Sequence, residues 1–245
     1  PRLYDLLVLA ITLSMAMTPL LPLLCPPLPS PKVQPVAVPE QFREIDADEP
    51  RVVIAGMGRM GQIVARILRA QNIKFVALDT SVETIELSRS FGGVPVYYGD
   101  PMRPEILNAA KVGDAEFFII ATDDPDTNIK TAELVHKLYP HIKIIARARN
   151  RQHVHRLVDL GAHAVRETFY SSLEMSRQTL IGLGLTPEQA DARIKRFKHH
   201  DEQVLEAQHA IYDDAVKVKQ TAQDARAELA KLFEADQLEE QSAKN

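Results

Sequence analysis

Cysteine is almost absent from this chain, whose 245 residues include only Cys25. An internal disulfide is therefore excluded, which favours a reducing compartment. Cysteines and histidines do not cluster at metal-ligand spacing, so we expect no structural zinc site. A surplus of positive charge is also missing, because the formal net charge is -4 and acidic and basic residues are mixed. We therefore expect no nucleic-acid partner.

Charged residues are missing from positions 6–24 near the start of the chain. At about 1.5 Å per residue, this run reaches roughly the 30 Å thickness of a bilayer core. We expect residues 1–24 to form the end of a transmembrane helix. A signal peptide or a merely buried segment is the alternative, although a small-residue cleavage site is lacking and Pro19 and Pro22 lie late in the run. Prolines then recur up to Pro50, which predicts an extended, semi-rigid linker over 25–50.

After the linker, short β-branched runs alternate with helical patterns. Runs that are apolar throughout and separated by helices indicate a parallel sheet covered on both faces. Six predicted strands suggest the order 3-2-1-4-5-6, and thus an α/β, doubly wound, Rossmann-like domain over 51–166. The strands are predicted at 51–55, 74–79, 94–98, 116–121, 142–147 and 162–165, and the helices at 60–71, 82–90, 104–109, 126–138 and 152–160.

Only helices are predicted beyond residue 166. A helix over 168–181 places Phe169, Leu173 and Leu180 near one face, and Pro187 then opens a short helix. Further on, apolar and small residues recur at alternating spacings of four and three, which predicts a heptad seam. A packed surface helix and an intermolecular coiled coil both fit this seam. Its positions are Val204, Gln208, Ile211, Ala215, Val218, Ala222, Ala225, Leu229 and Leu232.

Three glycines follow the first predicted strand in RVVIAGMGRMG, at the spacing G-x-G-x-x-G. Gly56 lets the chain turn sharply, Gly58 lets a phosphate approach the backbone, and Gly61 lets the helix lie close to the strand. Arg59 and Met60 lie in the first turn of that helix, where free N–H groups and the positive dipole end attract phosphate. The motif predicts a nucleotide-binding cleft.

Asp79 ends the second predicted strand, where a carboxylate can accept hydrogen bonds from both ribose hydroxyls. Thr80 follows without a nearby arginine, so a 2′-phosphate would be repelled; AMP, ATP and NAD(H) all meet this requirement. Asp100, Thr122 and Asp123 also follow predicted strands and could line the adenosine pocket. Plain helix capping is the alternative for such loop residues.

A catalytic arrangement is not recognisable in this sequence. A dehydrogenase normally has a second domain that holds substrate against the nicotinamide, together with a proton-transfer residue. Here only helices follow, and the histidines lie on or beside predicted helices without a catalytic pattern. Binding without turnover is therefore the leading interpretation. An NAD-dependent oxidoreductase and a separate soluble subunit of a potassium channel or transporter are the alternatives.

The motifs GMGRMGQIVARIL, YYGDPMRPEIL, ATDDPDTN, IIARARN and RETF, with Asp79, resemble the cytoplasmic RCK or KTN domain of the Kef family. These proteins are glutathione-gated potassium efflux systems, potassium/proton antiporters of the bacterial inner membrane. The resemblance implies an upstream transmembrane antiporter domain and potassium as the transported ion. It also implies a domain-swapped homodimer whose crossover and dimerisation helices span 167–198, followed by a helical extension over 199–245. An adenine nucleotide, AMP or NAD(H), is implied in each cleft, and an ancillary flavin-dependent quinone oxidoreductase is a further implied partner.

The same resemblance implies a glutathione site between subunits. Reduced glutathione is expected to hold the system closed, and bulky glutathione adducts to open it during electrophile stress. By motif, Arg66, Phe91 and Arg166 match residues of that site. Guanidinium groups suit a tripeptide with two carboxylates. Asp201 departs from the family pattern, because relatives carry an amide side chain there and Asp201 presents a negative charge.

Overall fold

The computed structural model describes residues 2–17, 38–90 and 94–242, with side chains described as far as residue 234. Two compact units divide the chain, at Pro1–Ala37 and Val38–Asn245. The first unit contains helix α1 (Arg2–Met17), whose residues are all exposed. Over the described ranges, no helix is both long enough and apolar enough to cross a bilayer. The predicted span continues through 18–24, which lie outside those ranges.

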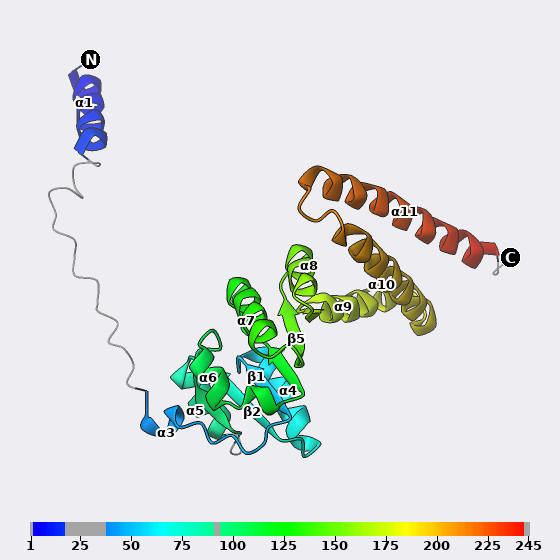
Figure 1. Cartoon of the computed structure of the whole chain (residues 1–245). Helices are drawn as coiled ribbons and strands as arrows, with labels where there is room; N and C mark the ends of the chain where they lie inside the picture. Colours follow the sequence, from blue (N-terminus) through cyan, green and yellow to red (C-terminus); the bar gives the residue numbers. More distant parts are fainter. Residues whose placement is uncertain (1, 18–37, 91–93, 243–245) are drawn as a thin grey trace. The chain divides into compact units, whose positions relative to one another are not determined.

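A six-stranded parallel sheet forms the centre of the second unit, with the order β3-β2-β1-β4-β5-β6. The predicted strand order is therefore confirmed. Figure 1 labels its strands β1, β2 and β5. The strands are β1 (Val52–Ala55), β2 (Phe75–Asp79), β3 (Val96–Tyr98), β4 (Phe117–Ile120), β5 (Lys143–Ala148) and β6 (His163–Arg166). The helices between them are α4 (Arg59–Ala70), α5 (Val82–Ser90), α6 (Pro104–Ala109), the short 3-10 helix η1 (Val112–Asp114), α7 (Pro125–Leu138) and α8 (Arg151–Asp159).

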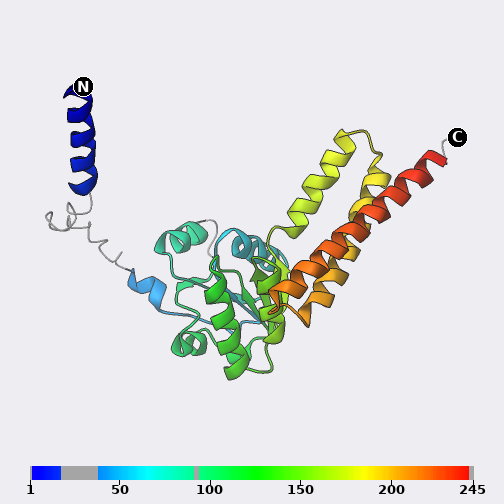
Figure 2. The same ribbon diagram turned by 90° about the horizontal axis from the view of Figure 1, so that it is seen from above.

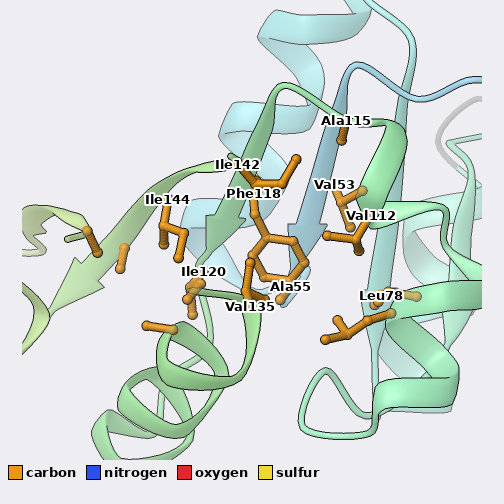
Figure 3. Close-up of a cluster of buried hydrophobic side chains, with 14 of the residues drawn as sticks. Val53, Ala55, Leu78, Val112, Ala115, Phe118, Ile120, Val135, Ile142 and Ile144 are labelled. Atoms are coloured by element: carbon orange, nitrogen blue, oxygen red, sulfur yellow. The ribbon is translucent and has the colours of Figure 1, made fainter. Parts of the chain in front are cut away.

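Hydrophobic residues fill both faces of this sheet. On β1, Val53 belongs to one buried cluster and Ile54 to the other, because side chains alternate between the two faces of a strand. Helices α6, α7 and α8 cover the first face, and α4 and α5 cover the second. Figure 3 shows the fully buried Phe118 of β4 among Val53, Val112 and Val135. Burial on both faces explains why the strands read as continuous apolar runs.

The described part of the predicted linker is not extended. Residues 38–50 contain the short helix α3 (Glu40–Arg43) and pack on the sheet domain. Phe42 is 4% exposed, and the Arg89 guanidinium lies 4.6 Å from the centre of its ring. Tyr97 donates a hydrogen bond to the carbonyl of Asp46 at 3.0 Å. The high proline content predicted an extended segment and gave no sign of these contacts with the sheet domain. The expectation of an extended linker is therefore wrong over 38–50.

Three long helices follow the sheet: α9 (Phe169–Gly182), α10 (Pro187–His209) and α11 (Ala215–Ser242). Phe169, Leu173 and Leu180 line one cavity, which confirms their predicted common face on α9. Figures 1 and 2 both show α11 lying alongside α10. The helix opened by Pro187 has 23 residues, so the expectation of a short helix is wrong. A capping box between Thr186 and Gln189 fixes its start.

The predicted seam does not lie on one helix, because α10 ends at His209 and α11 begins at Ala215. Asp214 caps α11 by accepting hydrogen bonds from the N–H groups of Val216 and Lys217, both at 3.1 Å. Seam residues on the two helices instead meet across a hairpin, where they line one cavity of about 420 Å³. They are Val204 and Gln208 on α10, with Val218, Ala222, Ala225 and Leu229 on α11.

Candidate functional site

A cleft of about 540 Å³ lies at the carboxyl edge of the sheet. Its walls are the loops that follow β1, β2, β3 and β4. The chain leaves β1 on one side and β4 on the other, so the cleft lies where the strand order reverses, the usual ligand position in open parallel sheets. Seven predicted residues line it: Gly56, Gly58, Asp79, Thr80, Asp100, Thr122 and Asp123.

Two glycines give this cleft its shape. Gly56 has φ +96 and lies close to the loop that follows the neighbouring strand β4. A Cβ on Gly56 would lie 2.8 Å from the backbone nitrogen of Thr122 in that loop. A Cβ on Gly61 would lie 2.0 Å from the carbonyl oxygen of Gly56, which any side chain would push away. Gly61 therefore permits the close contact between α4 and β1 without lining the cleft. Above Gly58 the space is open, since a Cβ there would meet nothing within 4 Å.

The first turn of α4 begins at the cleft. Gly58 is the N-cap residue, and no side chain caps this helix. Its first turn carries no acidic residue, and Arg59 is its first residue. The first N–H groups of a helix have no partner within the helix and attract anions. Arg59 and Met60 do not line the cleft walls themselves. Their backbone N–H groups belong to the turn that a phosphate would approach.

Asp79 stands at the end of β2 with both carboxylate oxygens directed to backbone donors. The Met57 N–H donates to Oδ2 at 2.7 Å, and the Ser81 N–H donates to Oδ1 at 2.8 Å. These bonds hold the carboxylate against the glycine turn. Each oxygen keeps a further lone pair, so the group can still accept hydrogen bonds from a ligand hydroxyl.

The loop after β4 combines a cleft wall with helix caps. Asp124 caps α7 by accepting from the Thr127 N–H at 2.8 Å, and the hydrogen bonds from Thr127 lower the pKa of Asp124. Asp124 both caps α7 and lines the cleft. Buried Asn128 donates to the carbonyls of Thr122 at 3.2 Å and Arg147 at 3.1 Å. It fixes the ends of β4 and β5 to each other.

A second and larger cavity, of about 1000 Å³, lies where the loop after β5 and the end of β6 meet the C-terminal helices. We call it the arginine pocket, because Arg149, Arg151, Arg166 and Arg193 line it. Asp201 is its one acidic lining residue among those that the structure describes. Apolar residues of α9 and α10, together with serine and threonine side chains of α9, form most of the rest of the wall, and Phe233 adds a ring from α11. Such a cavity suits an anion that also carries an apolar group.

Two of the predicted glutathione residues meet in the arginine pocket. Arg166 Nη1 lies 2.6 Å from Oδ2 of Asp201, and Arg151 pairs with the other oxygen. The Arg166 guanidinium also stacks on Phe169, 3.5 Å from the ring centre. The negative charge of Asp201 is thus shared by two cations. Carboxylates of a ligand would compete with Asp201 for these guanidinium groups.

The other two predicted glutathione residues lie elsewhere. Arg66 is exposed on α4, where its Nε donates weakly to the Gln62 carbonyl at 3.4 Å, and it does not line the arginine pocket. Phe91 lies outside the described residues. Sequence reasoning missed Arg151, Arg193 and Phe233. Their only local signal was their placement on helices, which does not specify a common cavity.

Several histidines are buried instead of exposed to a ligand. His153 accepts from the Arg149 N–H at 3.1 Å, and burial lowers its pKa. His155 stacks on Tyr212, with ring centres 5.2 Å apart, and its pKa is lowered by burial and by neighbouring His209. Within the described ranges, histidine, cysteine and acidic side chains form no group of three or more that could hold a metal ion.

This doubly wound sheet, with an open cleft at its reversal point, defines a Rossmann-like domain of the kind that binds nucleotides. In agreement, the TrkA-N domain model matches residues 52–167. The model of the potassium efflux system KefB C-terminal domain matches residues 171–245.

Individual relatives narrow the assignment. The Kef C-terminal domain of Shewanella denitrificans, in an AMP-bound form, is 38% identical; the match covers 65% of this chain and 98% of that domain, with a TM-score of 0.60. This chain belongs to the Kef family of C-terminal domains. The glutathione-regulated potassium-efflux system protein KefC of Salmonella arizonae is 42% identical over 203 residues, 82% of this chain. The matched part is 32% of that protein, so the chain spans about a third of its relative's length.

Proposed function

We propose that this chain is the cytoplasmic regulatory part of a potassium/proton antiporter of the bacterial inner membrane, and that it binds ligands without turning them over. An adenine nucleotide, AMP or NAD(H), occupies the cleft at the carboxyl edge of the sheet. The observation that carries this proposal is the position of Asp79 beside the uncapped start of α4. A carboxylate for ribose and a helix terminus for phosphate then face one ligand. The AMP-bound form of the Shewanella relative supports it.

The test of the nucleotide site is a pair of titrations on the full chain, with AMP and with 2′-deoxy-AMP. Removing the hydroxyl should weaken binding by about tenfold or more, since a hydrogen bond to a charged group contributes roughly 1.5–3 kcal/mol. In Asp79→Asn the two ligands should bind with nearly equal affinity. Asp48→Asn, which removes an exposed carboxylate outside the cleft, is the matched control. A deoxy penalty that survives in Asp79→Asn would contradict the assigned role.

Glutathione and its adducts bind the arginine pocket in this proposal. Four arginines supply donors for the two carboxylates of the tripeptide, while Phe169, Phe197 and Phe233 offer apolar surface to a thiol substituent. Arg66 would come from a second subunit, because it does not line this pocket in its own chain. The site then lies between the subunits of a homodimer, and Phe91 is proposed to contact the thiol side.

Gating follows if the two ligand classes prefer different arrangements of the helices. Glutathione holds the closed arrangement, and a bulky adduct favours the open one, because a ligand can shift a conformational equilibrium only by its difference in affinity. In this proposal an upstream transmembrane domain transports potassium, and a flavin-dependent quinone oxidoreductase is an ancillary partner. Potassium efflux from cells carrying Arg166→Ala should lose its response to adducts while the nucleotide affinity of the domain stays unchanged.

A further inference from the structure

The nucleotide cleft and the arginine pocket are connected through one buried side chain. Arg147 lies on β5, between the strand that precedes the cleft wall and the strand that precedes the pocket. Its side chain is only 6% exposed. Nη1 pairs with Asp123, and Nε pairs with Glu167. One guanidinium therefore bridges a residue that lines the cleft and a residue beside the pocket.

The cleft end of this bridge is open to a ligand. Asp123 lines the cleft, and its side chain is 75% exposed although it pairs with a buried partner. The side chain of Asn128 provides a second link, because its amide donates hydrogen bonds to the backbone carbonyls of both Thr122 and Arg147. A ligand group that contacts Asp123 would alter how strongly this carboxylate holds Arg147.

The pocket end of the bridge is enclosed. Glu167 directly follows β6, with its side chain 19% exposed, and its N–H donates to the Ala148 carbonyl at 3.1 Å. Its neighbours Arg166 and Thr168 both line the arginine pocket, whereas Glu167 is not among the described lining residues of either cavity. A shift of the Glu167 backbone would therefore also displace the adjoining Arg166.

A buried guanidinium must keep its charged partners, since an unpaired charge in this environment is costly. Burial alone would lower the pKa of Arg147, but hydrogen bonds and charge from Asp123 and Glu167 raise it above its ordinary value. The group thus stays charged and depends on both carboxylates. If a ligand weakens the ion pair between Arg147 and Asp123, the buried guanidinium depends more strongly on its ion pair with Glu167.

We propose that Arg147 couples the two ligand sites, so that nucleotide in the cleft changes the affinity of the arginine pocket for glutathione. This inference rests on the proposed function. Arg147 and Glu167 act as positioning residues, because neither needs to touch a ligand. Coupling between two sites is reciprocal, so glutathione must change nucleotide affinity by the same factor.

The experiment measures four dissociation constants on the full chain by calorimetry: AMP with and without saturating reduced glutathione, and glutathione with and without saturating AMP. In the wild type, both ratios should agree and differ from one by about fivefold or more. In Glu167→Gln, AMP affinity without glutathione should stay within about twofold of the wild type. Both ratios should fall to near one, because the ion pair between Arg147 and Glu167 that is proposed to carry the coupling is lost. Arg147 keeps Asp123 as its partner in this variant. Arg147→Lys, which keeps the charge but not the fork, is a second variant in which both ratios should also fall to near one.

Glu116→Gln is the matched control, because it removes one exposed partner of Arg51 and lies just before β4, at the opposite end of that strand from the cleft. Its ratios should equal those of the wild type. Ratios of one in the wild type, with both ligands bound, would overturn the coupling and leave the proposed function intact. Unchanged coupling in both Glu167→Gln and Arg147→Lys would show that Arg147 does not carry the coupling between the two sites. Failure of AMP to bind the wild type would instead refute the nucleotide site, and the coupling with it.

Discussion

The nucleotide cleft and the arginine pocket are built in different ways. Loops that directly follow four strands form the cleft, and backbone N–H groups fix its carboxylate Asp79. The pocket takes its wall from three long helices and its charge from arginine side chains. Sheet register determines the first site, whereas the packing of α9, α10 and α11 determines the second. We therefore expect a ligand in the cleft to stabilise the edge of the sheet, and a ligand in the pocket to act on the packing of these helices.

The largest expected effect tests the rigidity of the cleft. Gly61→Ala should destabilise the domain by about 4 kcal/mol or more, because its Cβ would collide with the Gly56 carbonyl and the helix would have to move. Gly58→Ala is the matched control, since open space surrounds a Cβ there. That control should change stability by only about 1 kcal/mol while weakening AMP binding. Urea unfolding followed by circular dichroism measures both. Equal stability of the two variants would show that the helix is not held against the strand.

A smaller effect tests the charge of the pocket. Asp201 holds two of the guanidinium groups that a glutathione carboxylate would need. Asp201→Asn should therefore tighten glutathione binding about tenfold, or roughly 1.4 kcal/mol. The neighbouring Glu202→Gln removes the same charge from an exposed position and should leave the affinity nearly unchanged. Calorimetry with thermal unfolding of each variant separates binding from stability. Weaker binding in Asp201→Asn would mean that this carboxylate organises the pocket instead of competing for it.

The smallest effect concerns pH at the junction of α8 with the C-terminal helices. Burial, with His209 next, lowers the pKa of His155 from its ordinary value of 6.5. The unfolded chain therefore binds a proton at a higher pH than the native chain. This contribution to stability is present above pH 6.5 and is lost as pH falls through the lower native pKa. Asp159 and Tyr212 also face this histidine pair.

His155→Leu cannot take up the proton, so its urea midpoint should fall less than that of the wild type between about pH 8 and pH 5.5. The lower pH lies about 1 pH unit below the ordinary histidine pKa. Exposed His199→Gln is the control and should follow the wild type. A wild-type acid loss that is unchanged in His155→Leu would place the titrating group elsewhere.

Local patterns predicted the sheet and the cleft well. Apolar runs and the G-x-G-x-x-G spacing were enough to place β1, α4 and Asp79, because each strand end and its loop are consecutive in sequence. The sheet order followed from the number and spacing of strands. Even so, the bonds from Asp79 to Met57 and Ser81 depend on three-dimensional approach and could not be read from the pattern.

The helical part was predicted less well. The apolar spacing continues through residues 210–214, which concealed the turn between α10 and α11, although Asp214 is a recognisable N-cap. Likewise, prolines around Phe42 hid its burial against β3 and Arg89. The arginine pocket joins residues from four separate segments. Only Arg166 and Asp201 were anticipated, and both came from family resemblance because helix placement is not a local property.

The most direct test of two separate sites is an AMP titration of the full chain with and without saturating glutathione, repeated with Asp79→Asn. We predict one AMP per chain in both conditions. Asp79→Asn should weaken AMP about tenfold, the loss of roughly 1.4 kcal/mol, while glutathione still binds. Glutathione that abolishes AMP binding competitively, or a single substitution that removes both ligands from a folded chain, would contradict the assignment of the cleft and the arginine pocket to different ligands.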